Sequence, residues 1–137
     1  MIPDWTSALI GIPFVPHGRD EKGVDCWGLL RLAMQRGRGI LLSEARGEYK
    51  NPCDPTEIKP YVERLRRQDE RWREVAEGAE EPGDAVLLRL RGVPMHVGLV
   101  VAPGWMLHIN RGVRSHLARY RSPEWARRVV AFYRYAE

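Results

Sequence analysis

Cys26 is the residue with the clearest chemical potential, because it follows Asp25 at the expected start of an amphipathic helix in the string GVDCWGLL. Backbone N–H groups and the helix dipole favour negative charge at a helix N-terminus. A thiolate at Cys26 is therefore expected to form below the ordinary cysteine pKa of about 8.5. The thiolate is the nucleophilic form of cysteine, so Cys26 is a candidate for covalent catalysis.

Two histidines further along the chain could supply the proton transfers that a thiol nucleophile needs. His96 lies in the run HVGLVV, and His108 lies in the run MLHI that follows the turn Ala102-Pro103-Gly104. Side chains alternate between the two faces of a strand, so His96 shares a face with Gly98. The turn predicts a hairpin that brings the two histidines near each other. A nucleophile, a base and an orienting group would then converge.

These motifs together resemble a known family. In order along the chain they are DCWGLL, a GD pair before a strand, HVGLVV, and MLHI after a turn. This combination resembles the NlpC family of papain-fold cysteine peptidases, which cut bacterial cell-wall peptides. The similarity covers roughly residues 5 to 110. The first part, LIGIPFVPHGRDEKGVDCWGLLR, looks most like the branch encoded in phage tail-assembly and gene-transfer-particle clusters.

The resemblance implies a role for each candidate residue. Cys26 would be the nucleophile, His96 the general base, and His108 the residue that orients His96; Asn110, on the same strand face as His108, is the alternative orienting group. The implied substrate is the peptide stem of peptidoglycan, cut without a cofactor or a metal. Arg19, Lys22 and Arg111 are candidates to contact the carboxylates of such a stem, although the sequence does not place them around a cleft.

One departure from the family pattern concerns substrate binding. Many members carry a tyrosine ahead of the cysteine, and the matching position here is Phe14. His17-Gly18 stands where a glycine pair is common, and Tyr49 is a candidate to compensate for the missing hydroxyl. The resemblance therefore assigns no substrate-binding residue.

Other interpretations compete with catalysis. Most cysteines in soluble proteins are small buried hydrophobic residues, and the turn residue Cys53 is read as incidental. His17 and His116 are read as satisfied core or surface residues. A zinc site of Cys26, His96 and His108 is chemically possible, but the spacing matches no compact zinc motif. A second class of function is a structural tail component that keeps the peptidase fold without useful turnover.

The pattern of apolar residues predicts a single α+β domain over residues 1–137, with N-terminal helices packed on an antiparallel sheet. Helices are expected over Pro3 to Ile10, over Asp25 to Arg36 with Gly37 ending it, and from Asp54 to about Gln68. Expected strands are Trp72 to Ala76, Ala85 to Leu90, His96 to Val101, Trp105 to Ile109, Val113 to Leu117 and Arg128 to Tyr135. The family resemblance implies that this domain is papain-like.

Composition limits the partners. The 137 residues carry a net charge of +4, and arginine outnumbers lysine 19 to 3 along the whole chain. This spread argues against a focused nucleic-acid surface. No secretory leader and no apolar run of roughly 20 residues is present, so no membrane partner is expected. We expect synthesis in the cytoplasm and, by the resemblance, incorporation into a phage or phage-like tail that acts at the cell wall.

Overall fold

The computed structural model describes residues 4–42 and 71–135. The first range holds one α-helix and short elements: η1 (Asp4–Leu9), β1 (Arg19–Asp20), β2 (Gly23–Val24) and α1 (Cys26–Arg38). The second range holds β3 (Trp72–Val75), β4 (Ala85–Leu90), β5 (Val93–Ala102), β6 (Trp105–His108), β7 (His116–Arg119), η2 (Ala126–Arg128) and β8 (Val129–Tyr135). The fold is α+β, as the sequence predicts, with the papain-like arrangement of a helix beside an antiparallel sheet.

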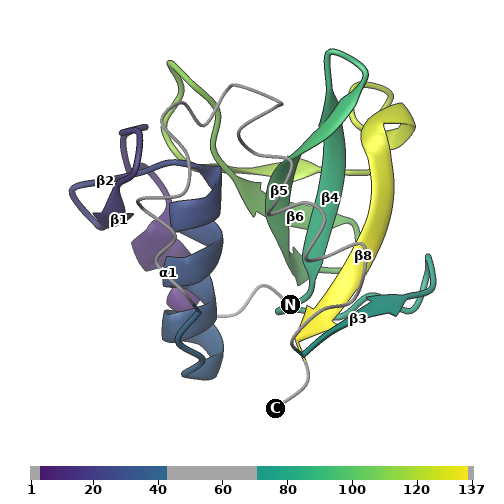
Figure 1. Ribbon diagram of the computed structural model, residues 1–137, viewed down its shortest axis with the longest axis horizontal. Helices are drawn as coiled ribbons and strands as arrows, with labels where there is room; N and C mark the ends of the chain where they lie inside the picture. Colours follow the sequence, from purple (N-terminus) through teal and green to yellow (C-terminus); the bar gives the residue numbers. More distant parts are fainter. Residues whose placement is uncertain (1–3, 43–70, 136–137) are drawn as a thin grey trace.

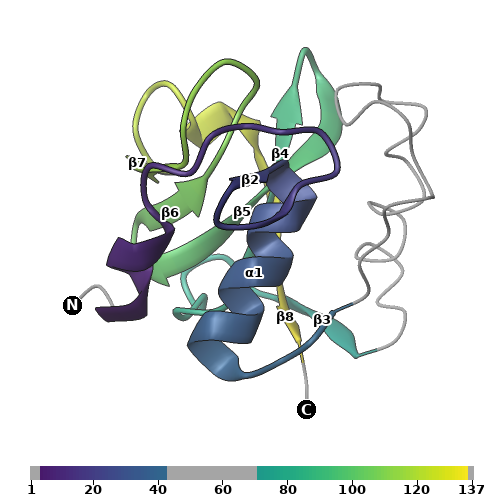
Figure 2. The same ribbon diagram turned by 90° about the vertical axis from the view of Figure 1, so that its left-hand side faces the viewer.

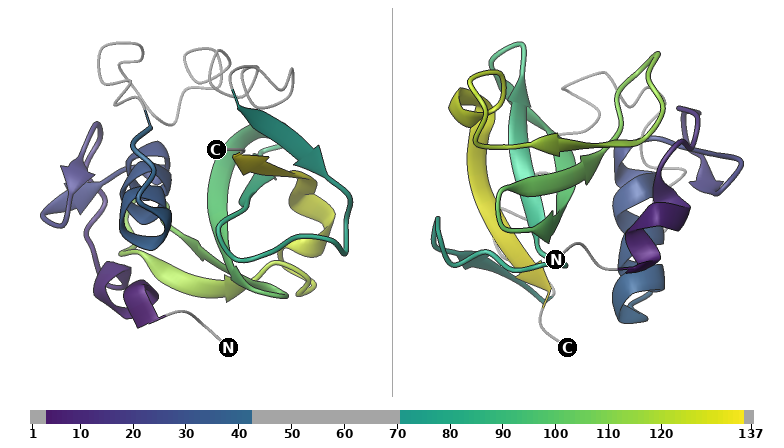
Figure 3. Two further views of the ribbon diagram at one scale, coloured as in Figure 1. Left: turned by 90° about the horizontal axis from the view of Figure 1, so that it is seen from below. Right: turned by 180° about the vertical axis from the view of Figure 1, so that it is seen from behind.

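Six strands form one antiparallel sheet in the order β3-β8-β4-β5-β6-β7. The sheet is strongly curved, and α1 lies along one of its faces (Figures 1 and 2). Seen from below, β1, β2 and η1 stand on the far side of α1 from the strongly curved part of the sheet (Figure 3). The sheet and α1 together form the frame that holds both parts of the candidate site.

Capping residues fix both ends of the helix α1. Asp25 caps its first turn by accepting a hydrogen bond from the Gly28 N–H at 2.7 Å. Gly39 caps the C-terminal end of the helix. Its φ of 68° lies in the left-handed region, which glycine adopts without steric strain. The prediction that Gly37 ends the helix is wrong, because the helix continues through Gly37 to Arg38. The missing side chain at Gly37 instead makes room for the Trp5 ring, which a Cβ there would overlap.

Two clusters of buried apolar residues lie on the two faces of the sheet. The larger one lies between α1 and the sheet, where Leu29 and Ala33 of the helix belong to the same cluster as Leu99 and Leu107 of the strands. The second cluster lies on the other face and includes Val100, Met106, Trp125 and Phe132. The alternation of Val100 with Leu99 confirms the strand reading of HVGLVV.

Several predicted boundaries differ from the structure. The first helix is a 3₁₀ helix rather than an α-helix. The segment between it and α1, where no strand is expected, contains the short antiparallel pair β1 and β2. The strand expected at Val113 to Leu117 begins only at His116. Ser115 bonds instead to the N-terminal segment, because its N–H donates to the Ile12 carbonyl and its hydroxyl donates to the Leu9 carbonyl.

The predicted helix from Asp54 to Gln68 lies outside the described residues, and so do Cys53 and Tyr49. In the described part of the chain, no helix has the length and apolar character needed to cross a bilayer.

Candidate active site

Cys26 is the first residue of α1, and the residue before it fixes the position of this helix end. The Asp25 carboxylate is fully buried and accepts hydrogen bonds from the backbone N–H groups of Gly28, at 2.7 Å, and His17, at 2.9 Å. The predicted N-cap role of Asp25 is thereby confirmed. The same carboxylate ties the preceding loop to the helix, so the backbone around Cys26 is held from both sides.

Arg19 supports this helix end rather than the substrate. Its Nη1 lies 3.0 Å from Oδ1 of Asp25 and also donates to the Gly18 carbonyl at 2.8 Å. Both side chains of this ion pair are buried, so the expectation that Arg19 contacts a substrate is wrong. Lys22 is exposed and is not among the residues that line the pocket described below.

Gly28, the glycine of the string DCWG, is required at its position for a steric reason. A Cβ at Gly28 would overlap the carbonyl oxygen of Gly18. The loop that contains Gly18 therefore packs directly on the first turn of α1, and this close approach needs a residue without a side chain.

His96 and His108 form the second half of the site. His96 lies on β5 and His108 ends β6, and Nε2 of His96 lies 2.9 Å from Nδ1 of His108. Each of the two histidines is 1% exposed, and the buried ring of Trp125 packs against both imidazole rings, with centroid distances of 6.0 Å to His96 and 4.9 Å to His108. This hydrogen bond uses Nε2 of His96 and leaves Nδ1 as the nitrogen that can serve a group in the pocket.

Burial keeps both rings neutral. Loss of hydration lowers the pKa of His96 to about 4, with a further lowering from the charge of His116. Burial lowers the pKa of His108 to about 2, and the charges of His96 and His116 act in the same direction. At neutral pH, His96 is therefore an unprotonated imidazole that can accept a proton.

His116 belongs to this cluster, which the sequence interpretation missed. It lies directly opposite His108 in the β6–β7 ladder, with the two ring centroids 4.4 Å apart. Its Nδ1 lies 2.9 Å from the carbonyl oxygen of Arg114, so Nδ1 carries the proton in this bond. The sequence interpretation treats His116 as a satisfied core or surface residue, because the strand expected over Val113 to Leu117 carries no local signal of its pairing with the strand that holds His108.

Cys26 and His96 line one pocket of about 550 Å³. Asn110 and Arg111 also line it, whereas His108 lies behind His96. The hydrogen bond to His96 is thus made by His108, and Asn110 faces the pocket. The apolar part of the wall comes from five residues on four segments: Phe14, Leu90, Met95, Ile109 and Val113. Because Cys26 is the first residue of α1, the pocket lies at the N-terminal end of this helix.

The zinc alternative finds no support in this geometry. Within residues 4–42 and 71–135, no three histidine, cysteine, aspartate or glutamate side chains are grouped so as to hold a metal ion.

Comparison with known proteins identifies the family. The NlpC/P60 family profile matches residues 11–134, which is most of the chain. The chain belongs to the NlpC/P60 family. No curated protein sequence matches it. The matched residues include the motif string around Cys26 and both His96 and His108, so the site described above lies inside the match.

Solved NlpC/P60 structures share this fold at low sequence identity. A lipoprotein-like NLP/P60 family protein from Staphylococcus aureus has a TM-score of 0.65 and 16% identity, over 98% of this chain and 40% of its own. The NlpC/P60 domain of the peptidoglycan hydrolase SagA has a TM-score of 0.61 and 17% identity, over 96% of this chain and 93% of its own. The resuscitation promoting factor interacting protein RipA, with one cysteine mutated, has a TM-score of 0.58 and 20% identity, over 96% of this chain and 58% of its own. The chain thus spans less than half of the S. aureus protein.

Proposed function

We propose that this NlpC/P60 chain is a cysteine endopeptidase that hydrolyses amide bonds in the peptide stems of peptidoglycan. The observation that carries the proposal is the shared pocket: Cys26, at a helix N-terminus, and His96, bonded to His108, line the same cavity. The relative SagA is a peptidoglycan hydrolase, which supports the substrate class. In this proposal His108 is a positioning residue that acts through His96.

The proposed reaction has two halves. In the first, Nδ1 of His96 takes the proton of the Cys26 thiol while sulfur bonds to the substrate carbonyl carbon. The C–N bond then breaks, His96 returns the proton to the leaving amine, and a thioester remains. In the second half, water gives a proton to His96 and attacks the thioester, which releases the carboxylic acid and restores the thiol.

The geometry supplies two aids to this chemistry. The N–H of Cys26 lies at the N-terminal end of α1, where backbone donors stabilise a developing oxyanion. Losing one such donor typically costs about 3 kcal/mol of barrier. The neutral state of His96 favours general-base action on a thiol over a preformed ion pair.

The test uses the purified full chain and insoluble peptidoglycan. The expected result is a time-dependent release of new amine termini, located by mass spectrometry of the soluble peptides. Cys26→Ala should abolish the release, and Cys53→Ser, which removes the other cysteine, should retain it. Release by Cys26→Ala at the wild-type rate would reject the proposal.

A second candidate function is a structural tail component with little turnover, and Phe14 favours it. Phe14 lines the pocket at the position where many family members carry a tyrosine hydroxyl. If the chain has lost turnover for this reason, Phe14→Tyr should raise the rate of amine release well above the wild-type rate. If the wild type is active, the same substitution should change the rate only slightly.

The setting in a phage or phage-like tail is part of the proposal. It is supported by the likeness of the segment before Cys26 to the phage tail-assembly and gene-transfer-particle branch. Delivery by a particle would bring an enzyme made in the cytoplasm to the cell wall, and other tail proteins would be its partners. Immunoblotting of purified tail particles for this chain is the test, and its absence from them would reject this setting.

A further inference from the structure

Three arginines surround the pocket that contains Cys26 and His96. Arg91 lies in the turn between β4 and β5, Arg111 follows β6, and Arg128 ends η2. The described residues that line the pocket include no aspartate or glutamate. Since His96 is neutral, the described wall of the pocket carries three positive charges and no negative one.

These three arginines differ from the arginines of the fold that pair with buried carboxylates. Arg19, Arg121 and Arg134 each pair with a buried carboxylate, those of Asp25, Glu80 and Asp84. Arg91 and Arg111 make no ion pair or hydrogen bond with another described residue. The Arg128 guanidinium lies 5.2 Å from the centroid of the Trp125 ring, a contact that orients the cation without neutralising it. The guanidinium groups of these three pocket arginines are therefore available to bind an anionic ligand.

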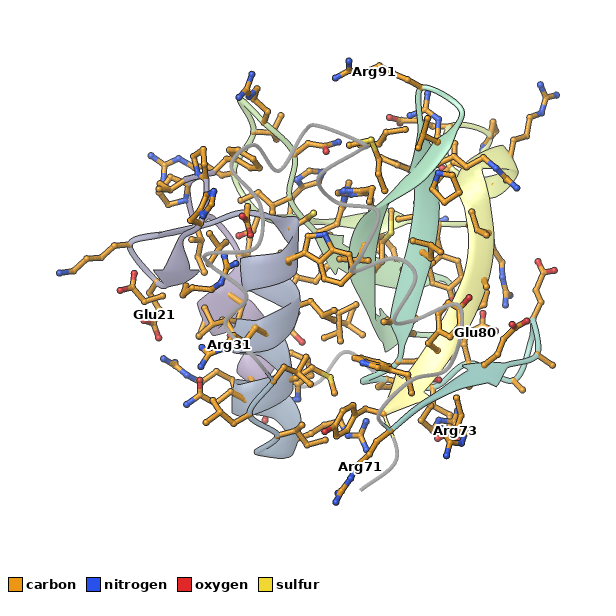
Figure 4. The ribbon with its side chains drawn as sticks, in the orientation of Figure 1. Glu21, Arg31, Arg71, Arg73, Glu80 and Arg91 are labelled. Carbon is orange, nitrogen blue, oxygen red and sulfur yellow. The ribbon has the colours of Figure 1, made fainter. Side chains whose placement is uncertain are left out.

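Arg91 occupies a backbone position that folding alone does not favour. Leu90 pairs with Val93, so Arg91 and Gly92 form a two-residue turn, with φ of 51° and 77°. Such turns favour asparagine, aspartate or glycine at the first position, because other side chains are strained at positive φ. Figure 4 shows the Arg91 side chain leaving the hairpin tip toward the side of the molecule where α1 lies. A strained residue that carries charge to the pocket indicates a role in binding.

We propose that Arg91, Arg111 and Arg128 form an anion subsite that selects substrates with a free carboxylate beside the bond that is cut. This inference rests on the proposed peptidase function and adds a selection rule to it. Guanidinium groups bind carboxylates through charge-assisted hydrogen bonds that a carboxamide cannot match. The enzyme therefore distinguishes two peptides of equal shape that differ only in whether this group is an acid or an amide.

The experiment compares two synthetic stem peptides that differ only in a carboxylate or a carboxamide next to the scissile bond. The wild type should cleave the carboxylate peptide with a kcat/KM at least about 10-fold higher, and the preference should shrink as NaCl is raised. Arg111→Gln and Arg128→Gln should each reduce the preference by about 5-fold, mostly through KM. Arg127→Gln, an exposed neighbour that does not line the pocket, is the matched control and should leave it unchanged.

Arg91→Asn separates charge from folding. Asparagine suits positive φ, so this variant should unfold at the same or a higher temperature than the wild type and still lose part of the preference. Equal cleavage of both peptides by the wild type would overturn the subsite and leave the peptidase proposal standing. If neither peptide is cleaved, the peptidase proposal fails, and calorimetric binding of both peptides to the Cys26→Ala chain decides the subsite. Equal affinities there would overturn it as well.

Discussion

The neutral state of His96 can be measured without any substrate. Burial, with the nearby charge of His116, holds its pKa at about 4 instead of 6.5. At pH 5.5 a histidine with a pKa of 6.5 is about 90% protonated, and one with a pKa of 4 is about 3% protonated. A carbon–proton NMR titration of the histidine Cε1–H groups from pH 3 to 8, assigned with His96→Gln, should show no inflection of His96 above pH 5. An inflection near 6.5 would refute the reasoning.

The same titration has a consequence for stability. The folded pKa of His96 lies below the unfolded one, so the unfolded chain takes up this proton first as the pH falls. The free energy of unfolding should therefore be unaffected by His96 above pH 6.5 and decrease between pH 6.5 and 4. A shift from 6.5 to about 4 corresponds to a loss of about 3 kcal/mol. Urea unfolding at pH 7, 5.5 and 4.5 measures this slope.

Two variants test this account: one tests the contribution of His96 to the pH dependence of stability, and the other tests the effect of His116 on the pKa of His96. His96→Gln should flatten the slope, although the further-lowered pKa of His108 keeps part of it. His116→Gln removes a neighbouring positive charge at acid pH, so the inflection of His96 should rise but stay below 6.5 because the ring remains buried. An unchanged inflection in His116→Gln would show that His116 does not act on His96.

Other predictions concern the helix end that holds Cys26. Asp25→Ala should lower the free energy of unfolding by about 3–5 kcal/mol in urea unfolding, because it leaves Arg19 buried without its partner; a loss below about 1 kcal/mol would contradict this. Gly28→Ala should cost about 1–3 kcal/mol in the same assay, since its Cβ would overlap the Gly18 carbonyl, and an unchanged midpoint would disprove this close approach. His17, with a φ of 65°, should tolerate glycine with equal or higher thermal stability, whereas His17→Val should lower the melting temperature; the reverse order would refute the strain.

Local patterns in the sequence were sufficient for the parts of the site that depend on neighbours along the chain. The start of α1 follows from Asp25 and the apolar spacing after it, and the face shared by His96 and Val100 follows from strand alternation. The hairpin that joins β5 and β6 follows from its turn residues. These features depend on short-range chemistry, which a sequence displays directly.

The missed features depend on contacts between distant segments. Arg19 is a candidate for substrate contact in the sequence interpretation, which assigns Asp25 only a capping role, whereas the two side chains form a buried ion pair. His116 and Arg128 join the site through strand register and the path of η2, neither of which has a local signal. The one available sign was Arg91-Gly92 between two apolar strands, a turn in which an arginine is unusual.

Ser115 connects the pocket to the beginning of the chain. Its backbone and hydroxyl make four hydrogen bonds to residues 9–12, at distances of 2.6–2.8 Å. The loop that ends at Ser115 also supplies Asn110, Arg111 and Val113 to the pocket wall. The family match begins only at residue 11, so a protein trimmed to that match would lose Leu9 and part of this anchor. A chain trimmed to the family match would therefore have a less firmly anchored pocket wall, and the ten residues before the match should be retained in any shortened version of this chain.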